Sequence, residues 1–320
     1  GRALRISNSK AGGEMAACLV SGPFDAAVHR FVSCDYRVPE QAYVDLAAVI
    51  AGRRYLVRMS DDDQSSVVLG EFPGFVADDR WHHVEFDLWA LLRRLNLPTR
   101  EVGALVLADH GWHSTPVGCA VRVDNLRIDR LHGDEPPRVA WEGAGPLSWA
   151  IDESPATAPP GQPLDGSLED ALAALTHFDG WLHVRAGDHV LHRRLALDRE
   201  GPRVEAVEPL PDSQAASSTV SVTLTDRGPA GVDPASIIMR VNERDYTVED
   251  PALAYDYSAE TLTWRYDRAM VGADVIPDGS RFEVELLQAA DVLGSAMHEP
   301  VRWSWVMDHS LDTAPPDPPE

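Results

Sequence analysis

Lysine is almost missing from this sequence, since Lys10 is the single lysine among 320 residues. The basic residues number 28, nearly all of them arginine, against 51 acidic residues, and the formal net charge is −23. A chain of this charge repels phosphate backbones and anionic lipid headgroups. Long hydrophobic runs are also absent, since none approaches the ~18–20 residues of a membrane span. We therefore expect no nucleic-acid partner and no membrane insertion.

Cysteine is scarce as well, with Cys18, Cys34 and Cys119 far apart in the chain. No CxxC pair and no paired-histidine spacing occurs, so zinc and redox motifs are unsupported. Cys18 and Cys34 fall in neighbouring alternating runs and would bridge if those runs pair. Small buried thiols are the favoured interpretation, because free cysteine is commonly buried.

Short alternating segments broken by Gly, Pro, Asp and Asn are abundant, and they predict an all-β protein. One helical interruption is expected at Leu88–Leu95, where leucines recur at three- and four-residue spacing. So many strands in the first part require two packed sheets. The expected strands there are Ala3–Asn8, Met15–Val20, Val28–Arg37, Ala42–Ile50, Arg53–Met59, Ser65–Gly70, Arg80–Leu88, Val102–Asp109 and Cys119–Leu131.

The run Asp78-Asp79-Arg80-Trp81-His82-His83-Val84 is the most distinctive in the chain. It resembles a strand of laminin-G-like and other concanavalin-type jelly rolls. With the closing strand around Arg122–Ile128, it makes the first part similar to extracellular bacterial carbohydrate-binding modules. The resemblance implies a jelly-roll β-sandwich over residues 1–133, which we call the first module.

Two later segments share an internal pattern of an Asp-Gly turn, an alternating strand and then Ala-x-Asp. They begin at Asp179-Gly180 and at Asp278-Gly279. Each is followed by a last strand that ends in aspartate, and the whole resembles bacterial Ig-like or fibronectin-III-like modules.

Proline-containing segments mark the remaining boundaries between modules. Residues 134–201, the second module, are expected to form a short fibronectin-III-like module that is either truncated or completed by its neighbours, with a candidate helical turn at Leu168–Leu175. Residues 202–310, the third module, are expected to form an Ig-like β-sandwich, and residues 311–320 a proline-rich linker. The start at Gly1 and this tail favour a piece of a longer polypeptide.

A sugar-binding sandwich needs an exposed aromatic ring to stack on a pyranose, flanked by polar groups that meet the hydroxyls. The loop from Asp109 to Pro116 has this composition, whereas Trp81 and Trp303 are more easily explained by core packing. The candidate ligand-binding residues are Trp112, His113 and Asp109 in this loop, with Tyr36, Arg58 and Glu85 as candidates to line one sheet face.

Metal and catalytic motifs are weak. Calcium is the one candidate cofactor, at Asp61-Asp62-Asp63 or Asp124-Asn125, although neither has the spacing of a dedicated loop. His82 and His83 would point to opposite faces of a strand and cannot share an ion. No Gly-x-Ser-x-Gly elbow and no nucleotide-binding glycine loop occurs. We expect no cofactor and no enzyme activity.

Three functions fit these features. The favoured one is a non-catalytic extracellular segment that binds a polysaccharide or cell-surface glycan, with the Ig-like modules as spacers. The second is a structural segment of a surface stalk or filament that contacts copies of itself or neighbouring modules and binds no sugar. The third is a non-catalytic appendage of a larger secreted enzyme.

Overall fold

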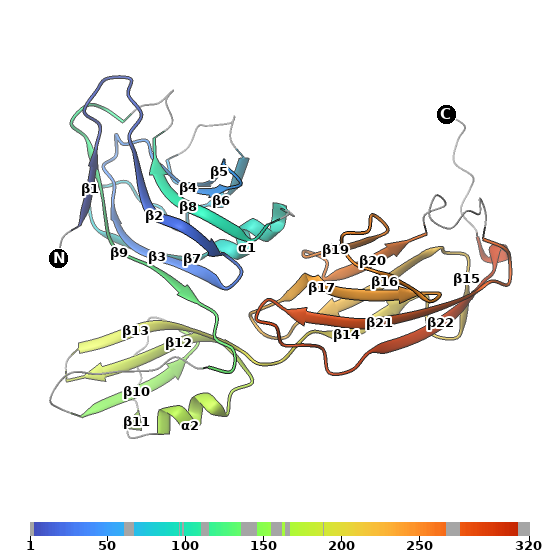
Figure 1. Cartoon of the computed structure of the whole chain (residues 1–320). Helices are drawn as coiled ribbons and strands as arrows, with labels where there is room; N and C mark the ends of the chain where they lie inside the picture. Colours follow the sequence, from blue (N-terminus) through green and yellow to red (C-terminus); the bar gives the residue numbers. More distant parts are fainter. Residues whose placement is uncertain are drawn as a thin grey trace. The chain divides into compact units, whose positions relative to one another are not determined.

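The structure is a computed structural model that describes residues 3–60, 67–95, 97, 99–109, 115–135, 146–154, 162–163, 167–187, 189–266 and 276–312 (Figure 1). The chain divides into two compact units, Gly1–Leu131 and His132–Glu320. The first unit holds most of the first module, and the second holds the second and third modules. Each unit is all-β apart from short helices, which confirms the predicted fold class.

The first unit contains two antiparallel-dominated sheets, of four strands in the order β1-β9-β3-β7 and of five strands in the order β2-β8-β4-β5-β6. All nine strands expected from the alternation form, within a few residues of the expected bounds. They are β1 (Leu4–Ser7), β2 (Ala16–Asp25), β3 (His29–Arg37), β4 (Asp45–Ile50), β5 (Arg53–Arg58), β6 (Val67–Glu71), β7 (His82–Asp87), β8 (Glu101–Ala108) and β9 (Ala120–Arg130).

The expected helical interruption also forms, as α1 (Leu88–Leu92) followed by a 3-10 turn, η1 (Arg93–Leu95). Asp87 caps α1, because its side chain accepts a hydrogen bond from the backbone N–H of Ala90 at 2.9 Å. Leu88 and Leu92 are buried, so the leucine spacing reports a face packed on the core. In the described part of the chain, no helix has the length and apolar character that a membrane crossing requires.

The second module contributes one four-stranded sheet, in the order β11-β10-β12-β13, to the described residues. Its core gathers Trp149, Leu182, Leu195 and Leu197 with side chains of the helix α2, which forms where a helical turn was expected. The elements are β10 (Leu147–Asp152), β11 (Gln162–Pro163), α2 (Ser167–Ala173), β12 (His177–Ala186) and β13 (His189–Asp198).

The third module is a sandwich of a four-stranded sheet, β14-β16-β20-β19, and a five-stranded sheet, β15-β22-β21-β17-β18. One aromatic-rich core joins them, in which the rings of Phe282 and Trp305 stack with centroids 4.6 Å apart and Trp264 is buried nearby. The elements are β14 (Arg203–Glu208), β15 (Ser213–Ala215), β16 (Thr219–Thr225), β17 (Val232–Val241), β18 (Arg244–Tyr246), β19 (Leu253–Asp256), β20 (Thr261–Arg265), β21 (Arg281–Asp291), β22 (Val301–Met307) and a 3-10 turn, η2 (His309–Leu311).

Of the two expected Asp-Gly turns, one is wrong and one is confirmed. Asp179-Gly180 lies inside β12 rather than in a turn, with Gly180 paired to Leu195. A Cβ atom at Gly180 would lie 2.5 Å from the ring of Phe178, so glycine serves close packing there. The Asp278-Gly279 turn does form, with Gly279 at φ +80°.

The three cysteines are free thiols, and the runs that carry Cys18 and Cys34 do not pair. Cys18 is exposed on β2, which pairs with β8, whereas Cys34 lies buried on β3 in the other sheet. Burial raises the pKa of the Cys34 thiol to about 12. The buried-thiol interpretation therefore fits Cys34 but not Cys18.

Candidate functional site in the first module

One face of the sheet β1-β9-β3-β7 is buried and the other carries polar groups. Along β3, Val32 and Tyr36 are buried in the core, while Asp35 lies between them on the opposite face. The register places polar residues of the neighbouring strands beside it. These cross-strand sets are Ser33 with Glu85 and Arg127, and Asp35 with His83 and Asp124.

Asp35 is the centre of this face. His83 Nδ1 lies 2.8 Å from one carboxylate oxygen of Asp35, and the Asn125 amide donates to the other at 2.5 Å. Asn125 has φ +50° beside a register shift between β3 and β9, and such a bulge re-aims a side chain. Burial alone would raise the pKa of Asp35, but the hydrogen bonds from Asn125 and His83 outweigh it and lower that pKa.

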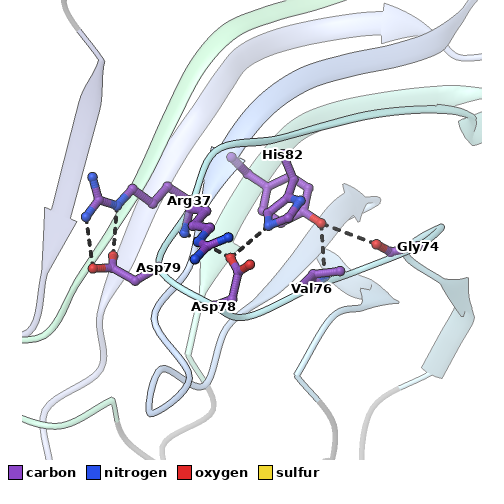
Figure 2. Close-up of polar contacts among 8 residues, drawn as sticks. Arg37, Gly74, Val76, Asp78, Asp79 and His82 are labelled. Atoms are coloured by element: carbon purple, nitrogen blue, oxygen red, sulfur yellow. Dashed lines mark hydrogen bonds and ion pairs between the residues drawn. The ribbon is translucent and has the colours of Figure 1, made fainter.

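The loop before β7 is fixed to the end of β3 by charged pairs (Figure 2). Arg37 binds Asp79 through two hydrogen bonds of 2.8 and 2.9 Å. His82 Nε2 lies 2.8 Å from Asp78 Oδ1. His83 instead bonds Asp35, so the two histidines bond different aspartates, as their positions on opposite faces of β7 require. The predicted division of the two histidines between faces is confirmed.

Tyr36 supports this loop from beneath. Its hydroxyl accepts a hydrogen bond from the backbone N–H of Val76 at 3.0 Å, as Figure 2 shows. Its ring is only 2% exposed and lies between Phe72 and Phe75, with centroids at 5.4 and 5.7 Å. The ring therefore has no surface on which a sugar could stack, contrary to the expectation that Tyr36 lines an open sheet face.

Trp81 is the exposed aromatic residue that the sequence interpretation missed. Its side chain is 46% exposed, although core packing was expected to explain it. Trp81 stands two residues before His83, so the alternation that places His83 on the polar face also assigns Trp81 to it. We call Trp81, Arg37, Asp35, His83 and Asn125 the Asp35 patch. The alternation of residues along β7, continued back from His83 to Trp81, was the feature of the sequence that could have indicated this exposed tryptophan.

Arg58 and Glu85 do not share a face with Tyr36. Glu85 lies on the polar face of β7, paired with Ser33, whereas Tyr36 points into the core. Arg58 belongs to β5 in the other sheet and lies 3.5 Å from Glu71. The expectation of one common face is wrong because it required a strand order that alternation alone does not specify.

Asp109 is buried, and its side chain bonds backbone groups of the protein. It is 2% exposed, and its carboxylate accepts hydrogen bonds from the backbone N–H groups of Met15 at 2.6 Å and Thr115 at 3.1 Å. Its neighbours Trp112 and His113 lie outside the described residues. Asp109 therefore ties the segments at Met15 and Thr115 together.

Of the two calcium sites expected from the sequence, the structure describes only one. Asp61-Asp62-Asp63 lies outside the described residues. At Asp124-Asn125, the Asp124 carboxylate accepts the backbone N–H of Asn125 at 2.9 Å, and the Asn125 side chain donates to Asp35. These contacts bond Asn125 to Asp35, and a calcium ion at Asp124-Asn125 stays a prediction.

Comparison with known proteins gives no family. No family model matches the sequence, and no curated protein matches it. Similar solved structures include the endo-beta-1,4-mannanase from Thermotoga petrophila, with 12% identity and a TM-score of 0.24 over 34% of this chain and 20% of that chain. The chain thus spans a fifth of the mannanase chain's length.

Two extracellular proteins are also similar. Human protocadherin-24 EC1-2 has 14% identity and a TM-score of 0.22, over 56% of this chain and 92% of that one. Drosophila OTK extracellular domains 3-5 have 10% identity and a TM-score of 0.23, over 96% of both chains. At such low TM-scores these likenesses carry no argument about function, and the all-β class rests on the sheets themselves.

Proposed function

We propose that the chain is a non-catalytic extracellular segment whose first module binds a neutral glycan or another surface polymer at the Asp35 patch. The second and third modules act as spacers. The observation that carries the proposal is the 46% exposure of Trp81, which directly precedes β7, the strand whose His83 bonds Asp35.

The chemistry of the patch supports this role. An indole ring presents a flat apolar surface that packs against the C–H face of a pyranose. The hydroxyls of the sugar then need donors and acceptors in place of water. Asp35 is an acceptor, and Asn125 and Arg37 carry donors. Because hydrogen bonds already hold these side chains in place, less conformational freedom is lost on binding.

The net charge of the chain limits the classes of polymer that it can bind. With a formal net charge of −23, the protein repels polyanions at long range. A neutral polysaccharide pays no such penalty, and stacking on tryptophan does not depend on charge. Neutral polymers are therefore the first ligands to screen.

The test uses the full chain on a glycan array and in affinity electrophoresis through gels that contain neutral polysaccharides. Trp81→Ala is expected to weaken binding by at least about tenfold, which corresponds to about 1.4 kcal/mol. Tyr43→Ala is the matched control, because Tyr43 is an exposed aromatic residue, at 39%, that precedes β4 in the other sheet. Trp112→Ala, the variant that the sequence indicates, completes the set.

Binding that is lost in Trp81→Ala and kept in Tyr43→Ala supports the proposal. Equal binding by the parent chain and Trp81→Ala contradicts the assignment of the patch. Absence of binding to every polymer, together with concentration-dependent polymerisation in light scattering, would favour the structural role instead.

A further inference from the structure

Three aspartates from separate elements converge in the second unit, where the second module joins the third. Asp198 is the last residue of β13, Asp226 directly follows β16, and Asp291 is the last residue of β21. One carboxylate oxygen from each lies within 4.8 Å of those of the other two. Asp198 and Asp291 are 0% and 1% exposed, and Asp226 is half-buried.

Backbone amides hold each carboxylate in place. The N–H of Ala230 donates to Asp198 Oδ2 at 2.8 Å, and the N–H of Gly228 donates to Asp226 Oδ1 at 3.0 Å. Asp291 Oδ1 accepts two such bonds, of 2.9 and 2.8 Å, from the turn at residues 293–295. The three side chains are therefore preorganised, as ligands of an ion would be.

Two oxygens of this cluster are buried without a partner. Asp291 Oδ2 and Asp226 Oδ2 are each buried and have no hydrogen-bond partner among the described residues. Because Oδ1 of Asp291 is held by the turn, Oδ2 is the oxygen that remains for the cluster. A buried carboxylate oxygen without a donor is costly, so it points to a ligand that supplies positive charge.

No basic side chain in the described part of the chain forms an ion pair with any of the three aspartates. Arg199, although adjacent to Asp198, instead donates to the carbonyl oxygens of Leu172 at 3.1 Å and Leu175 at 2.8 Å. Burial and then repulsion from the neighbouring carboxylates raise the pKa of Asp226 to about 7. Burial and the neighbouring carboxylates thus disfavour the charged form of Asp226, and no ion-paired cation among the described residues offsets this effect.

The backbone closes tightly over this cluster at Gly228. A Cβ atom at this position would lie 2.0 Å from Asp198 Oδ2. The loop from Asp226 to Ala230 therefore folds directly onto the carboxylate that ends β13, and leaves no room for a side chain at position 228.

We propose that Asp198, Asp226 and Asp291 bind a calcium ion that fastens the second module to the third. All the donors are oxygens, which suit a hard cation, whereas zinc in proteins is bound mainly by nitrogen and sulfur. Calcium–oxygen distances of about 2.3–2.6 Å put two oxygens on opposite sides of the ion about 4.6–5.2 Å apart. The ligand oxygens of the cluster all lie within 4.8 Å of one another, which is within this limit. Calcium also tolerates the irregular coordination of three strand ends better than magnesium.

The test measures calcium binding to the full chain after treatment with EDTA, by isothermal titration with calcium chloride. Asp226→Asn and Asp291→Asn keep the size of the side chain and remove one charge each. Each is expected to weaken one calcium-binding event by at least tenfold. Asp256→Asn is the matched control, because Asp256 also ends a strand and caps its own turn, at 2.7 Å from the N–H of Ser258, but is exposed outside the cluster. Unchanged calcium titrations of both cluster variants would overturn the proposal.

Thermal unfolding supplies a second readout. The expected change in unfolding temperature on substitution has the opposite sign to the change expected if the cluster only formed hydrogen bonds. In EDTA, Asp226→Asn should raise the unfolding temperature, because it removes repulsion among buried carboxylates. In calcium, the parent chain should gain stability and the variant should not. A variant that is destabilised equally in both buffers would show a hydrogen-bonding role only and contradict the proposal. Magnesium chloride that stabilises the parent as strongly as calcium chloride would contradict the choice of calcium.

Discussion

Replacement of Asp109 by alanine tests the fold and the site assignment together. The carboxylate accepts the backbone N–H groups of Met15 and Thr115, 94 and 6 residues away in the chain. Thr115 is itself 0% exposed, and its hydroxyl donates to the carbonyl of Tyr43 at 2.9 Å. Asp109 thus joins the start of β2 to a segment that contacts the region before β4.

The magnitude follows from these contacts. Asp109→Ala leaves two buried N–H groups without an acceptor, and each such group costs about 1–3 kcal/mol. The free energy of unfolding of the first unit should therefore fall by about 2–6 kcal/mol. Asp109→Asn retains one acceptor oxygen and should lose about half as much.

Hydrogen exchange of the full chain, followed by mass spectrometry of its peptides in increasing urea, resolves this local stability from that of the other modules. Faster exchange is expected in the peptides that hold Met15 and Thr115. A loss below about 0.5 kcal/mol, the usual range of surface substitutions, would refute the reasoning. If glycan binding were also lost in such an undamaged variant, Asp109 would be a ligand-binding residue, as its loop composition indicates.

Three further outcomes are expected. Gly228→Ala should destabilise the second unit by more than 1 kcal/mol in urea unfolding, because the new Cβ atom would lie 2.0 Å from Asp198 Oδ2; an unchanged midpoint would contradict that close packing. Trp264→Ala should cost about 3–5 kcal/mol in the same assay, since the ring is 2% exposed in the core of the third module. Burial and then the charge of His192 lower the pKa of His183, so the unfolded chain binds more protons below about pH 6.5 and stability falls as the pH falls. His183→Phe should reduce that loss between pH 7 and pH 5, and an identical pH dependence would disprove it.

Strand positions in the first module could be predicted because one buried face imposes strict alternation. The segment from His82 to Asp87 shows this, since Val84 and Phe86 are buried between more exposed polar neighbours. The same alternation would have assigned Trp81 to the polar face, but the large apolar side chain favoured a core interpretation. Residue type outweighed position there, and the 46% exposure of Trp81 shows that core packing was the wrong interpretation.

Contacts between distant strands could not be predicted in this way. Tyr36 is buried because the loop at residues 72–76 folds over it, and nothing in the sequence near Tyr36 specifies that loop. Aspartates at strand ends, such as Asp198 and Asp291, were visible as a pattern. Their convergence within 4.8 Å depends on how the strands are arranged in space and on a third residue, Asp226. Neither can be deduced from the alternation of residues along one strand.

Hydroxyl-radical footprinting of the full chain, with a neutral polysaccharide selected in the binding screen, tests the central claim most directly. Oxidation of each tryptophan and of Tyr43 is quantified by mass spectrometry with and without the polymer. We expect the polymer to protect Trp81, which is 46% exposed in the free chain, and to leave the exposed control Tyr43 unprotected. Saturating polymer that leaves the oxidation of Trp81 unchanged would contradict the assignment of the Asp35 patch as the binding surface.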